Sequence, residues 1–236
     1  MRTDGRHNDE LRPVKITPDF IRFAEGSCLI QMGSTMVLCN ASVEDKVPPH
    51  VKSGGWITAE YSMLPRANRE RSKRDIAKLK LSPRSAEIQR LIGRSLRSAV
   101  NLQLLGERTI TVDCDVLQGD GGTRTASVTG GFVALCLALK KLVERGELEK
   151  MPVRTCVSGI SAGLIGGEAM LDLCYEEDSR AIVDMNCVMT AEGNIIELQA
   201  TGEGRPYTPE EQQRLVALCA KGNAELCRLI RPYCGI

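Results

Sequence analysis

One glycine-rich segment constrains this chain more than any other, because it joins a strand pattern to a helix pattern. Residues 118–127 read Gln-Gly-Asp-Gly-Gly-Thr-Arg-Thr-Ala-Ser, after strand-like residues 109–117 and before helix-like residues 128–142. Adjacent glycines let backbone N–H groups converge in conformations that other residues avoid, and a helix start adds unpaired N–H donors. Arg124 stands at this junction, and its guanidinium offers paired donors that suit two oxygens of a phosphate. The segment predicts an anion pocket.

The same ten residues are also compatible with an ordinary glycine turn followed by a solvated arginine. Their spacing is not that of a P-loop, and no GxGxxG motif is present in the chain. The residues alone leave both interpretations open.

The composition is that of a globular protein. The chain has 236 residues, of which 42% are hydrophobic and 26% are charged, and this length suffices for one domain with a sizeable core. No run of 18 or more apolar residues occurs, so no membrane partner is expected. The polar residues at the start of the sequence predict no secretory signal.

Ten cysteines are present, and none forms a CxxC pair. Most lie inside apolar strand or helix patterns, as Cys39, Cys136 and Cys174 do. This placement is typical of buried, reduced thiols and argues against a disulfide framework or a zinc site. The expected compartment is therefore the cytoplasm.

A basic stretch separates the first strands from the first long helix. Between Arg66 and Arg84 lie eight basic and two acidic side chains, although the net charge of the chain is only +1. Such a cluster attracts polyanions through phosphate neutralisation, and a solvated helix face is the alternative. Aromatic residues make up only 3% of the chain, so base stacking is not expected to be the main mode of binding.

The remaining segments alternate between strand and helix patterns. Strands are predicted over 27–32, 35–43, 56–61, 109–117, 152–157, 158–165, 169–175, 181–190 and 194–200, and helices over 85–105, about 125–145 and about 209–230. Gly33-Ser34 is a hairpin signal, and Thr208 with Pro209 and Glu211 predicts a capped helix start. Hairpins outnumber βαβ units. We therefore predict an α+β fold, with mixed sheets packed against helices in a single domain over 1–236.

Two aspartates come close together in the hairpin predicted near residue 180. A period of two places Asp184 and Asn186 on the face opposite Val183 and Met185, and Asp178 lies in the turn before them. Two such carboxylates suit a hard divalent cation or the donation of a proton. A solvent-facing aspartate on a half-exposed strand explains the same pattern.

Six motifs follow one another in an order that covers essentially the whole chain. They are RTDGR at 2–6 with ELRP at 10–13, CNASVED at 39–45, GWITAEYSMLPR at 55–66, EIQRLIGRSLR at 87–97, GGTRTAS at 121–127, and DLCYEED at 172–178 with VDMN at 183–186. Together they resemble the ribonuclease PH family, bacterial phosphate-dependent 3′→5′ exoribonucleases that trim tRNA precursors. The resemblance implies the ribonuclease PH-like fold, which is also described as ribosomal protein S5 domain 2-like.

The resemblance also implies roles for particular residues. Inorganic phosphate, as co-substrate, would be bound by Arg84, Gly122, Thr123 and Arg124. Mg²⁺ binding and proton donation would fall to Asp178 and Asp184. RNA would be gripped by Arg66, Arg69, Arg71 and Arg74.

The expected reaction is the trimming of tRNA precursor 3′ ends with release of nucleoside diphosphates. The resemblance implies a homohexameric ring, a trimer of dimers, in which the basic loop of one subunit serves RNA at a neighbouring site. The alternative is a catalytically silent ring subunit that binds RNA and scaffolds active partners, because relatives of this fold include such subunits. The presence of Arg124, Asp178 and Asp184 favours the enzyme.

Two positions depart from the pattern of the family. Residues 51–55 form a segment that looks a couple of residues shorter than in typical members, and Pro83 stands where relatives often have glycine. Proline fixes φ and restricts the residue before it, so we expect a changed backbone path into Arg84.

Overall fold

The computed structural model describes residues 2–74 and 80–235, and in these residues it shows two β-sheets and four α-helices. The strands are β1 (Val14–Pro18), β2 (Gly26–Met32), β3 (Thr35–Glu44), β4 (Trp56–Met63), β5 (Thr109–Gln118), β6 (Val157–Ile165), β7 (Glu168–Leu171), β8 (Val183–Thr190) and β9 (Ile195–Gly202). The helices are α1 (Pro83–Ala99), α2 (Thr123–Glu144), α3 (Tyr175–Asp178) and α4 (Pro209–Cys234), with a short 3₁₀ helix, η2, at Leu102–Leu105. The predicted α+β class is confirmed.

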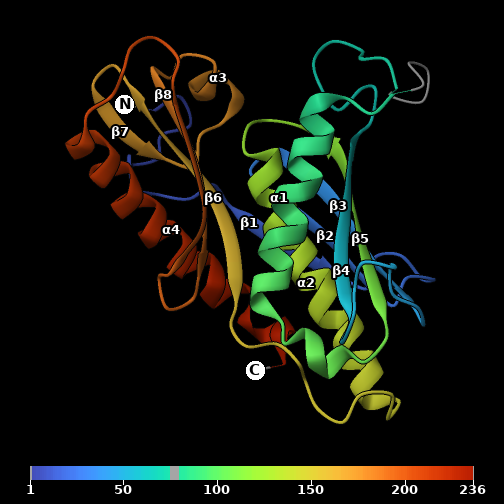
Figure 1. Ribbon diagram of the computed structural model, residues 1–236. Coiled ribbons are helices and arrows are strands. Elements are labelled where there is room, and N and C mark those ends of the chain that lie inside the picture. The colour runs from blue at the N-terminus through green and yellow to red at the C-terminus, as the bar shows by residue number, and fades with distance from the viewer. Residues whose placement is uncertain (1, 75–79, 236) are drawn as a thin grey trace.

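The first sheet is built from the N-terminal half of the chain in the order β1-β2-β3-β5-β4. β2 and β3 form the hairpin predicted at Gly33-Ser34, with Met32 opposite Thr35. Only β4 runs parallel to its neighbour β5, because α1 intervenes between these two strands in the sequence. This arrangement leaves β4 at one edge of the sheet, with α1 packed beside it (Figure 1).

The second sheet is antiparallel, in the order β7-β6-β8-β9, and α4 packs on β6, β7 and β8. α4 begins as predicted: the Thr208 hydroxyl accepts from the Glu211 N–H at 3.2 Å, and the Glu211 carboxylate accepts from the Thr208 N–H at 2.9 Å. This reciprocal pair satisfies two N–H groups that a helix start otherwise leaves open.

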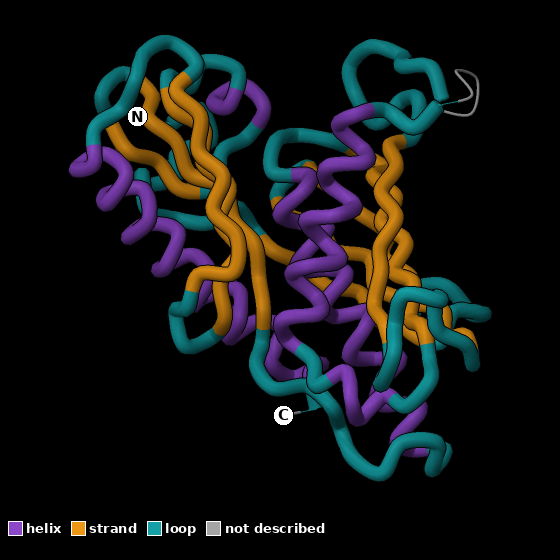
Figure 2. Tube along the Cα trace, in the orientation of Figure 1, coloured by secondary structure: helices purple, strands orange, loops and turns teal. Residues whose placement is uncertain are grey.

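Helix α2 holds the two halves together, since it contacts β2 and β3 on one side and β6 on the other (Figure 2). By length and composition it is the one described helix apolar enough to cross a bilayer, yet 78% of its apolar window is buried inside the fold. Phe132, Leu135 and Leu139 are fully buried in the shared core. The apolar character of α2 is thus explained by its central position.

The prediction of buried cysteines is confirmed for nine of the ten and is wrong for Cys174, which is half-buried and precedes α3 instead of lying in a strand. All ten belong to the described residues, all are free thiols, and nine are buried. Cys28, Cys39 and Cys114 lie directly opposite one another on β2, β3 and β5. They act as small apolar side chains in the sheet face that packs in the core.

Two predicted boundaries are wrong on the C-terminal side of α1. The helix predicted over 85–105 ends at Ala99, because Val100 is extended and forms a bridge with Val153. The apolar spacing continues past this break into η2, whose first turn is capped by Asn101. The strand predicted over 152–157 reduces to that single bridge, and β6 begins only at Val157.

The strand predicted over 169–175 is also too long. β7 ends at Leu171, and Asp172 turns the chain with a left-handed φ of 52°. The four residues that follow Cys174 form the short helix α3, so the alternation of buried and exposed side chains expected of a strand does not continue there. The facing of β8 is confirmed, since Val183 and Met185 are buried in the core on the face opposite Asp184.

Gly26 of β2 lies directly against the backbone of α2, and replacing it tests this packing. A Cβ at this position would stand 1.9 Å from the Ala134 carbonyl oxygen and 2.6 Å from the Ala138 nitrogen, both of them backbone atoms. We therefore expect Gly26→Ala to lower the free energy of unfolding by about 3 kcal/mol, the upper range for overpacking, in urea titrations.

Gly204→Ala is the matched control, because its Cβ would meet only the Ile182 side chain at 3.4 Å. If the unfolding midpoint of Gly26→Ala equals that of the control, α2 does not pack on β2 as described.

Candidate active site

A cleft of about 660 Å³ opens where the glycine loop, the start of α1 and the hairpin from α3 to β8 meet. These elements lie at the upper end of the molecule in Figure 1. Six predicted residues line this one cleft, namely Arg84, Gly122, Thr123, Arg124, Asp178 and Asp184. The structure therefore brings together the residues predicted to hold phosphate and those predicted to act as acids.

The glycine loop is shaped by two left-handed residues. Gly121 and Gly122 have φ values of 75° and 63°, and a Cβ on Gly121 would stand 2.4 Å from the Leu173 carbonyl oxygen. α2 starts directly after Gly122, and no side chain caps its first turn. Gly122, Thr123 and Arg124 line the cleft, so the uncapped N–H groups at the positive end of the helix dipole are suited to receive an anion there.

The Arg124 side chain is held from two other elements. Its Nη1 donates to Gln199 Oε1 on β9 at 2.9 Å and lies 3.7 Å from Glu87 Oε1 on α1. Gln199 Nε2 in turn donates to the same Glu87 oxygen at 2.7 Å. This chain of contacts fixes the guanidinium at the cleft wall, with one of its nitrogens engaged.

Arg84 reaches the cleft from the first turn of α1. Pro83 occupies the first helical position, where its fixed φ suits the helix and its missing N–H has no helical partner to lose. The Ser82 hydroxyl accepts from the Ser85 N–H at 3.0 Å and caps the same turn. Pro83 is therefore accommodated as the first residue of α1, and the expected change of the backbone path relative to the family stays a prediction.

Asp184 is the most perturbed acid of the cleft. Burial and the neighbouring Asp178 raise its pKa to about 6, against the opposing effect of Arg124. Its Oδ2 accepts from Asn186 Nδ2 at 3.2 Å, whereas its buried Oδ1 has no hydrogen-bond partner. A carboxyl with this pKa exchanges its proton near neutral pH, as a general acid requires.

Asp178 lies at the end of α3. It lines the same cleft as Arg84 and Arg124, which form the cationic wall of that cleft. Burial raises its pKa, and the charges of Arg84, Arg124 and Arg12 act in the opposite direction. The two carboxylates and two predicted phosphate ligands thus share one electrostatic environment. Such paired acids of unequal surroundings are typical of catalytic sites.

A divalent cation fits this pair of acids. Among residues 2–74 and 80–235, no three acidic, histidine or cysteine side chains form a group arranged to hold a metal. Mg²⁺ commonly binds one or two carboxylates and completes its shell with water and substrate phosphate. The unpartnered Oδ1 of Asp184, beside Asp178, is an oxygen of the required kind.

A buried arginine joins the glycine loop to the acidic hairpin, and the sequence patterns gave no role to it. Arg12 pairs with Asp172 through Nη2 and Oδ1 at 2.7 Å, and its backbone N–H donates to Oδ2 at 2.7 Å. The same guanidinium donates from Nη1 to the Asp120 carbonyl of the loop. Both residues fall in motifs used for the resemblance, but they stand 160 positions apart and no local period connects them.

The first residues of the chain reinforce this hairpin. Arg2 forms a bidentate pair with Glu177, at 2.7 and 2.6 Å, and donates to the Leu171 carbonyl at 2.7 Å. Burial alone would raise the pKa of Glu177, but the hydrogen bonds from Arg2 lower it. Glu177 also accepts from the Cys174 N–H and so caps α3. The N-terminal segment thus positions the hairpin that carries Asp178.

Residues 66–74 of the basic stretch form a largely exposed loop beside the cleft. Its four arginines predicted to bind RNA are all exposed: Arg66, Arg69, Arg71 and Arg74. Gly119 N–H donates to the Ala67 carbonyl at 2.8 Å, which pins this loop to the glycine loop. Lys78 and Asp75, two further charges of the stretch, fall outside the described residues.

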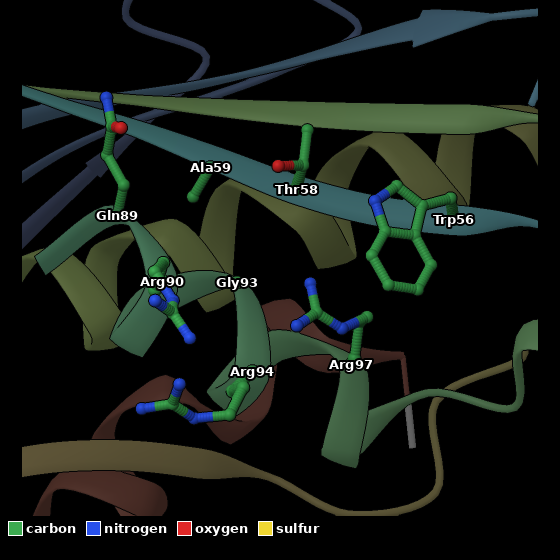
Figure 3. A pocket seen from close by; sticks show the side chains of 8 residues that line it. All are labelled: Trp56, Thr58, Ala59, Gln89, Arg90, Gly93, Arg94 and Arg97. Atoms are coloured by element: carbon green, nitrogen blue, oxygen red, sulfur yellow. The ribbon is translucent and has the colours of Figure 1, made fainter. Parts of the chain in front are cut away.

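A separate pocket of about 370 Å³ lies between α1 and the edge strand β4 (Figure 3). Arg97 lies 4.3 Å from the centre of the Trp56 ring and donates to the Ile57 carbonyl at 2.7 Å, and burial lowers its pKa. Arg94 pairs with Glu197 at 3.0 Å. These arginines are engaged by the fold itself, and the pocket contains none of the predicted site residues.

Family models match both halves of the chain. The RNase PH model described as "3' exoribonuclease family, domain 1" covers residues 10–141, and that described as "3' exoribonuclease family, domain 2" covers residues 155–222. The chain belongs to the 3′ exoribonuclease family. The prediction of a ribonuclease PH-like fold is thereby confirmed, and the single domain over 1–236 stays a prediction.

Solved structures of similar fold include Rrp46 from rice and chains of two exosome structures. Rrp46 from rice (Oryza sativa) shares 18% identity at a TM-score of 0.80, with 98% of each chain covered. A chain of the Archaeoglobus fulgidus exosome with RNA bound to the active site shares 24% identity at a TM-score of 0.80, covering 98% of this chain and 91% of that one. A chain of an archaeal exosome core shares 24% identity at a TM-score of 0.75, covering 98% and 90%.

The raised pKa of Asp184 predicts how the stability of the protein depends on pH. The native state binds the proton more tightly than the unfolded chain, so the stabilising contribution is present below about pH 4 and is lost as pH rises through about 6. Asp184→Asn imitates the protonated acid. We expect it to be more stable than the parent by about 2 kcal/mol at neutral pH and nearly equal at about pH 4.

Urea titrations at both pH values, with EDTA present to remove divalent cations, measure this difference. A parent protein as stable as Asp184→Asn at neutral pH would show that burial does not penalise the charged carboxylate.

The Arg12–Asp172 pair predicts a large loss of stability when one partner is removed. Asp172→Asn leaves the buried Arg12 charge without its main counterion, so we expect a loss of about 3 kcal/mol in the free energy of unfolding. Glu176→Gln, which removes the half-exposed pair with Arg180, is the control and should lose less than about 1 kcal/mol. Equal losses in the free energy of unfolding for the two variants would show that the Arg12–Asp172 pair does not stabilise the fold as described.

Proposed function

We propose that this protein is a phosphorolytic 3′→5′ exoribonuclease that trims the 3′ ends of tRNA precursors, as ribonuclease PH does. Inorganic phosphate is the co-substrate and nucleoside diphosphates are the products. The observation that carries the proposal is the shared cleft: an uncapped helix start with Arg124 and Arg84 faces two acids, one with a pKa of about 6. Membership of the 3′ exoribonuclease family supports RNA as the substrate.

The cationic wall holds the nucleophile in this mechanism. The N–H groups of Gly122 and Thr123, with Arg124, receive an orthophosphate, and Arg84 supplies a second positive charge. An orthophosphate oxygen forms a bond to the last internucleotide phosphorus, and the bond from phosphorus to the 3′-oxygen of the preceding nucleotide breaks. Two anions must come into contact, so charge neutralisation and in-line positioning are the main catalytic tasks.

Asp184 supplies the proton that the leaving 3′-oxygen takes up. With a pKa of about 6, roughly a tenth of the side chains are protonated at pH 7, and the arrival of anionic substrates raises that fraction. Arg124 opposes this effect and keeps the acid from being permanently protonated. Asp178 helps to raise the pKa of Asp184, because its negative charge is the second-largest cause of that rise after burial.

Mg²⁺ is the proposed metal, and the carboxylates of Asp178 and Asp184 would hold it; Asp184 donates a proton only in the form that does not bind the metal. When bound, it supplies further neutralisation of the phosphate charges that gather in the cleft. The arginines remain responsible for holding orthophosphate, because they lie on the opposite wall.

We further propose a cytoplasmic homohexamer, a trimer of dimers, in which Arg66, Arg69, Arg71 and Arg74 grip the RNA. Reduced, buried cysteines support the compartment. The exposed position of the four arginines beside the cleft supports the RNA contact. Relatives of similar fold belong to exosomes, as their descriptions state, which supports assembly into a larger complex.

A catalytically silent, RNA-binding ring subunit is the second candidate, and the similarity of fold to chains of exosomes favours it. A silent subunit has no need for a complete cleft. In this chain Arg84, Arg124 and both aspartates line one cavity, and an acid with a perturbed pKa lies in it. The first candidate is therefore the better supported.

Product analysis on a tRNA precursor with extra 3′ nucleotides separates the candidates. We expect nucleoside diphosphates that appear only when orthophosphate is added. Nucleoside monophosphates formed without orthophosphate would contradict phosphorolysis, and no product under either condition would favour the silent subunit.

Arg124→Ala tests the phosphate site within the same assay. Because Arg124 contacts the nucleophile, we expect phosphorolysis to fall by at least about a hundredfold, while affinity for single-stranded RNA changes less than about threefold. Arg145→Ala, an exposed arginine at the far end of α2, is the control and should keep full activity. Near-normal activity of Arg124→Ala would show that orthophosphate binds elsewhere.

A further inference from the structure

A second cavity continues the cleft toward the basic loop. It has a volume of about 620 Å³ and shares three lining residues with the cleft, Asn68, Gly119 and Tyr175. Its other walls come from Arg69, Glu70, Arg71, Ser72 and Asp120. A strand of RNA whose last phosphodiester lies in the cleft and whose upstream part meets the basic loop must pass through this cavity.

Tyr175 stands at the boundary between the two cavities, and its ring is unusually open. The residue is 53% exposed, although it begins α3 and its neighbours Leu173 and Glu177 are buried. The position of Tyr175 is fixed through the backbone, since its N–H donates to Asp120 Oδ1 at 3.2 Å. The glycine loop thus holds Tyr175 while the apolar ring faces the solvent-filled space.

Arg69 lies across from this ring. Its guanidinium carbon is 5.9 Å from the ring centre, a distance that gives a weak cation–π attraction at an exposed site. The pair places a flat aromatic face and a positive charge next to each other in the lining of this cavity. These are the two features that single-stranded nucleic acid binding requires, a surface for a base and a charge for the backbone.

We propose that Tyr175 is a stacking platform for one RNA base upstream of the scissile phosphodiester, and that Arg69 covers that base or binds its adjoining phosphate. The inference rests on the proposed function for the identity of the ligand. Stacking tolerates every base because each has a π face, so the platform positions the 3′ end without selecting its sequence. It also adds a stacking contact that the low aromatic content of the chain did not lead us to expect.

The test measures binding of single-stranded RNA without orthophosphate, so that no turnover takes place. Oligonucleotides carry 2-aminopurine, whose fluorescence is quenched by stacking, at each of the last four positions in turn. We expect quenching at one upstream position, and a loss of affinity of about tenfold to a hundredfold in Tyr175→Ala. Tyr175→Phe keeps the ring and should keep both the quenching and the affinity.

Phe23→Ala is the matched control. Phe23 is 88% exposed and has Arg22 at 5.7 Å from its ring centre, so it reproduces an exposed aromatic–arginine pair on the loop between β1 and β2. We expect no change in RNA affinity for this variant. If Phe23→Ala loses as much RNA affinity as Tyr175→Ala, removing any exposed aromatic side chain lowers RNA affinity by destabilising the protein. That result would overturn the proposal that Tyr175 stacks on a base.

An oligonucleotide lacking one base separates stacking from a merely structural role. Where the quenched position is made abasic, wild-type protein should lose the same tenfold to hundredfold affinity, and Tyr175→Ala should lose little more. If Tyr175 only positions Arg69, the Ala variant will lose as much affinity for abasic RNA as for intact RNA. That result would overturn the proposal.

The outcomes also distinguish this inference from the proposed function. Base quenching at Tyr175 in a protein that releases no nucleoside diphosphate would refute phosphorolysis and leave the platform standing. Normal phosphorolysis with an unchanged KM in Tyr175→Ala would refute the platform alone.

Discussion

The buried pair between Arg12 and Asp172 is the interaction on which the cleft depends. It connects three segments that are distant in the sequence: the N-terminal segment, the glycine loop and the acidic hairpin. A charge buried this deeply is tolerated only while its partner remains in place, so the pair fixes the separation of the two walls. It also explains why Asp172 accepts a left-handed backbone, because its carboxylate and its carbonyl both serve buried or half-buried arginines.

The cleft has positively charged arginines in its cationic wall and two aspartates in the acidic hairpin that faces it. Arg84, Arg124 and the first turn of α2 attract anions, whereas burial raises the pKa of both aspartates and the charge of Asp178 raises that of Asp184 further. The arginines limit this rise in pKa, Arg84 and Arg124 at Asp178 and Arg124 at Asp184. The solved structures of similar fold are below 25% identical and establish the fold alone. The assignment of an activity therefore rests on the family models and on this cleft.

Local patterns predicted the elements that local physics determines. Gly33-Ser34 predicted the hairpin of β2 and β3, and the Thr208 cap predicted the start of α4, because turn and cap chemistry act over a few residues. The predicted helix over 85–105 was too long because apolar spacing persists past Ala99, where tertiary pairing of Val100 with Val153 ends the helix. Neither the Arg12–Asp172 pair nor the meeting of Tyr175 with Arg69 has a local signature, since these contacts form only after the two halves pack together.

A crystal structure of the protein soaked in orthophosphate tests the central claim most directly. The account predicts one phosphate ion at the start of α2, within hydrogen-bond distance of the Thr123 N–H and of the Arg124 guanidinium, and on the side of the cleft that faces Asp184. A cleft that stays empty at millimolar orthophosphate, or a phosphate bound only at the arginine pocket between α1 and β4, would contradict it.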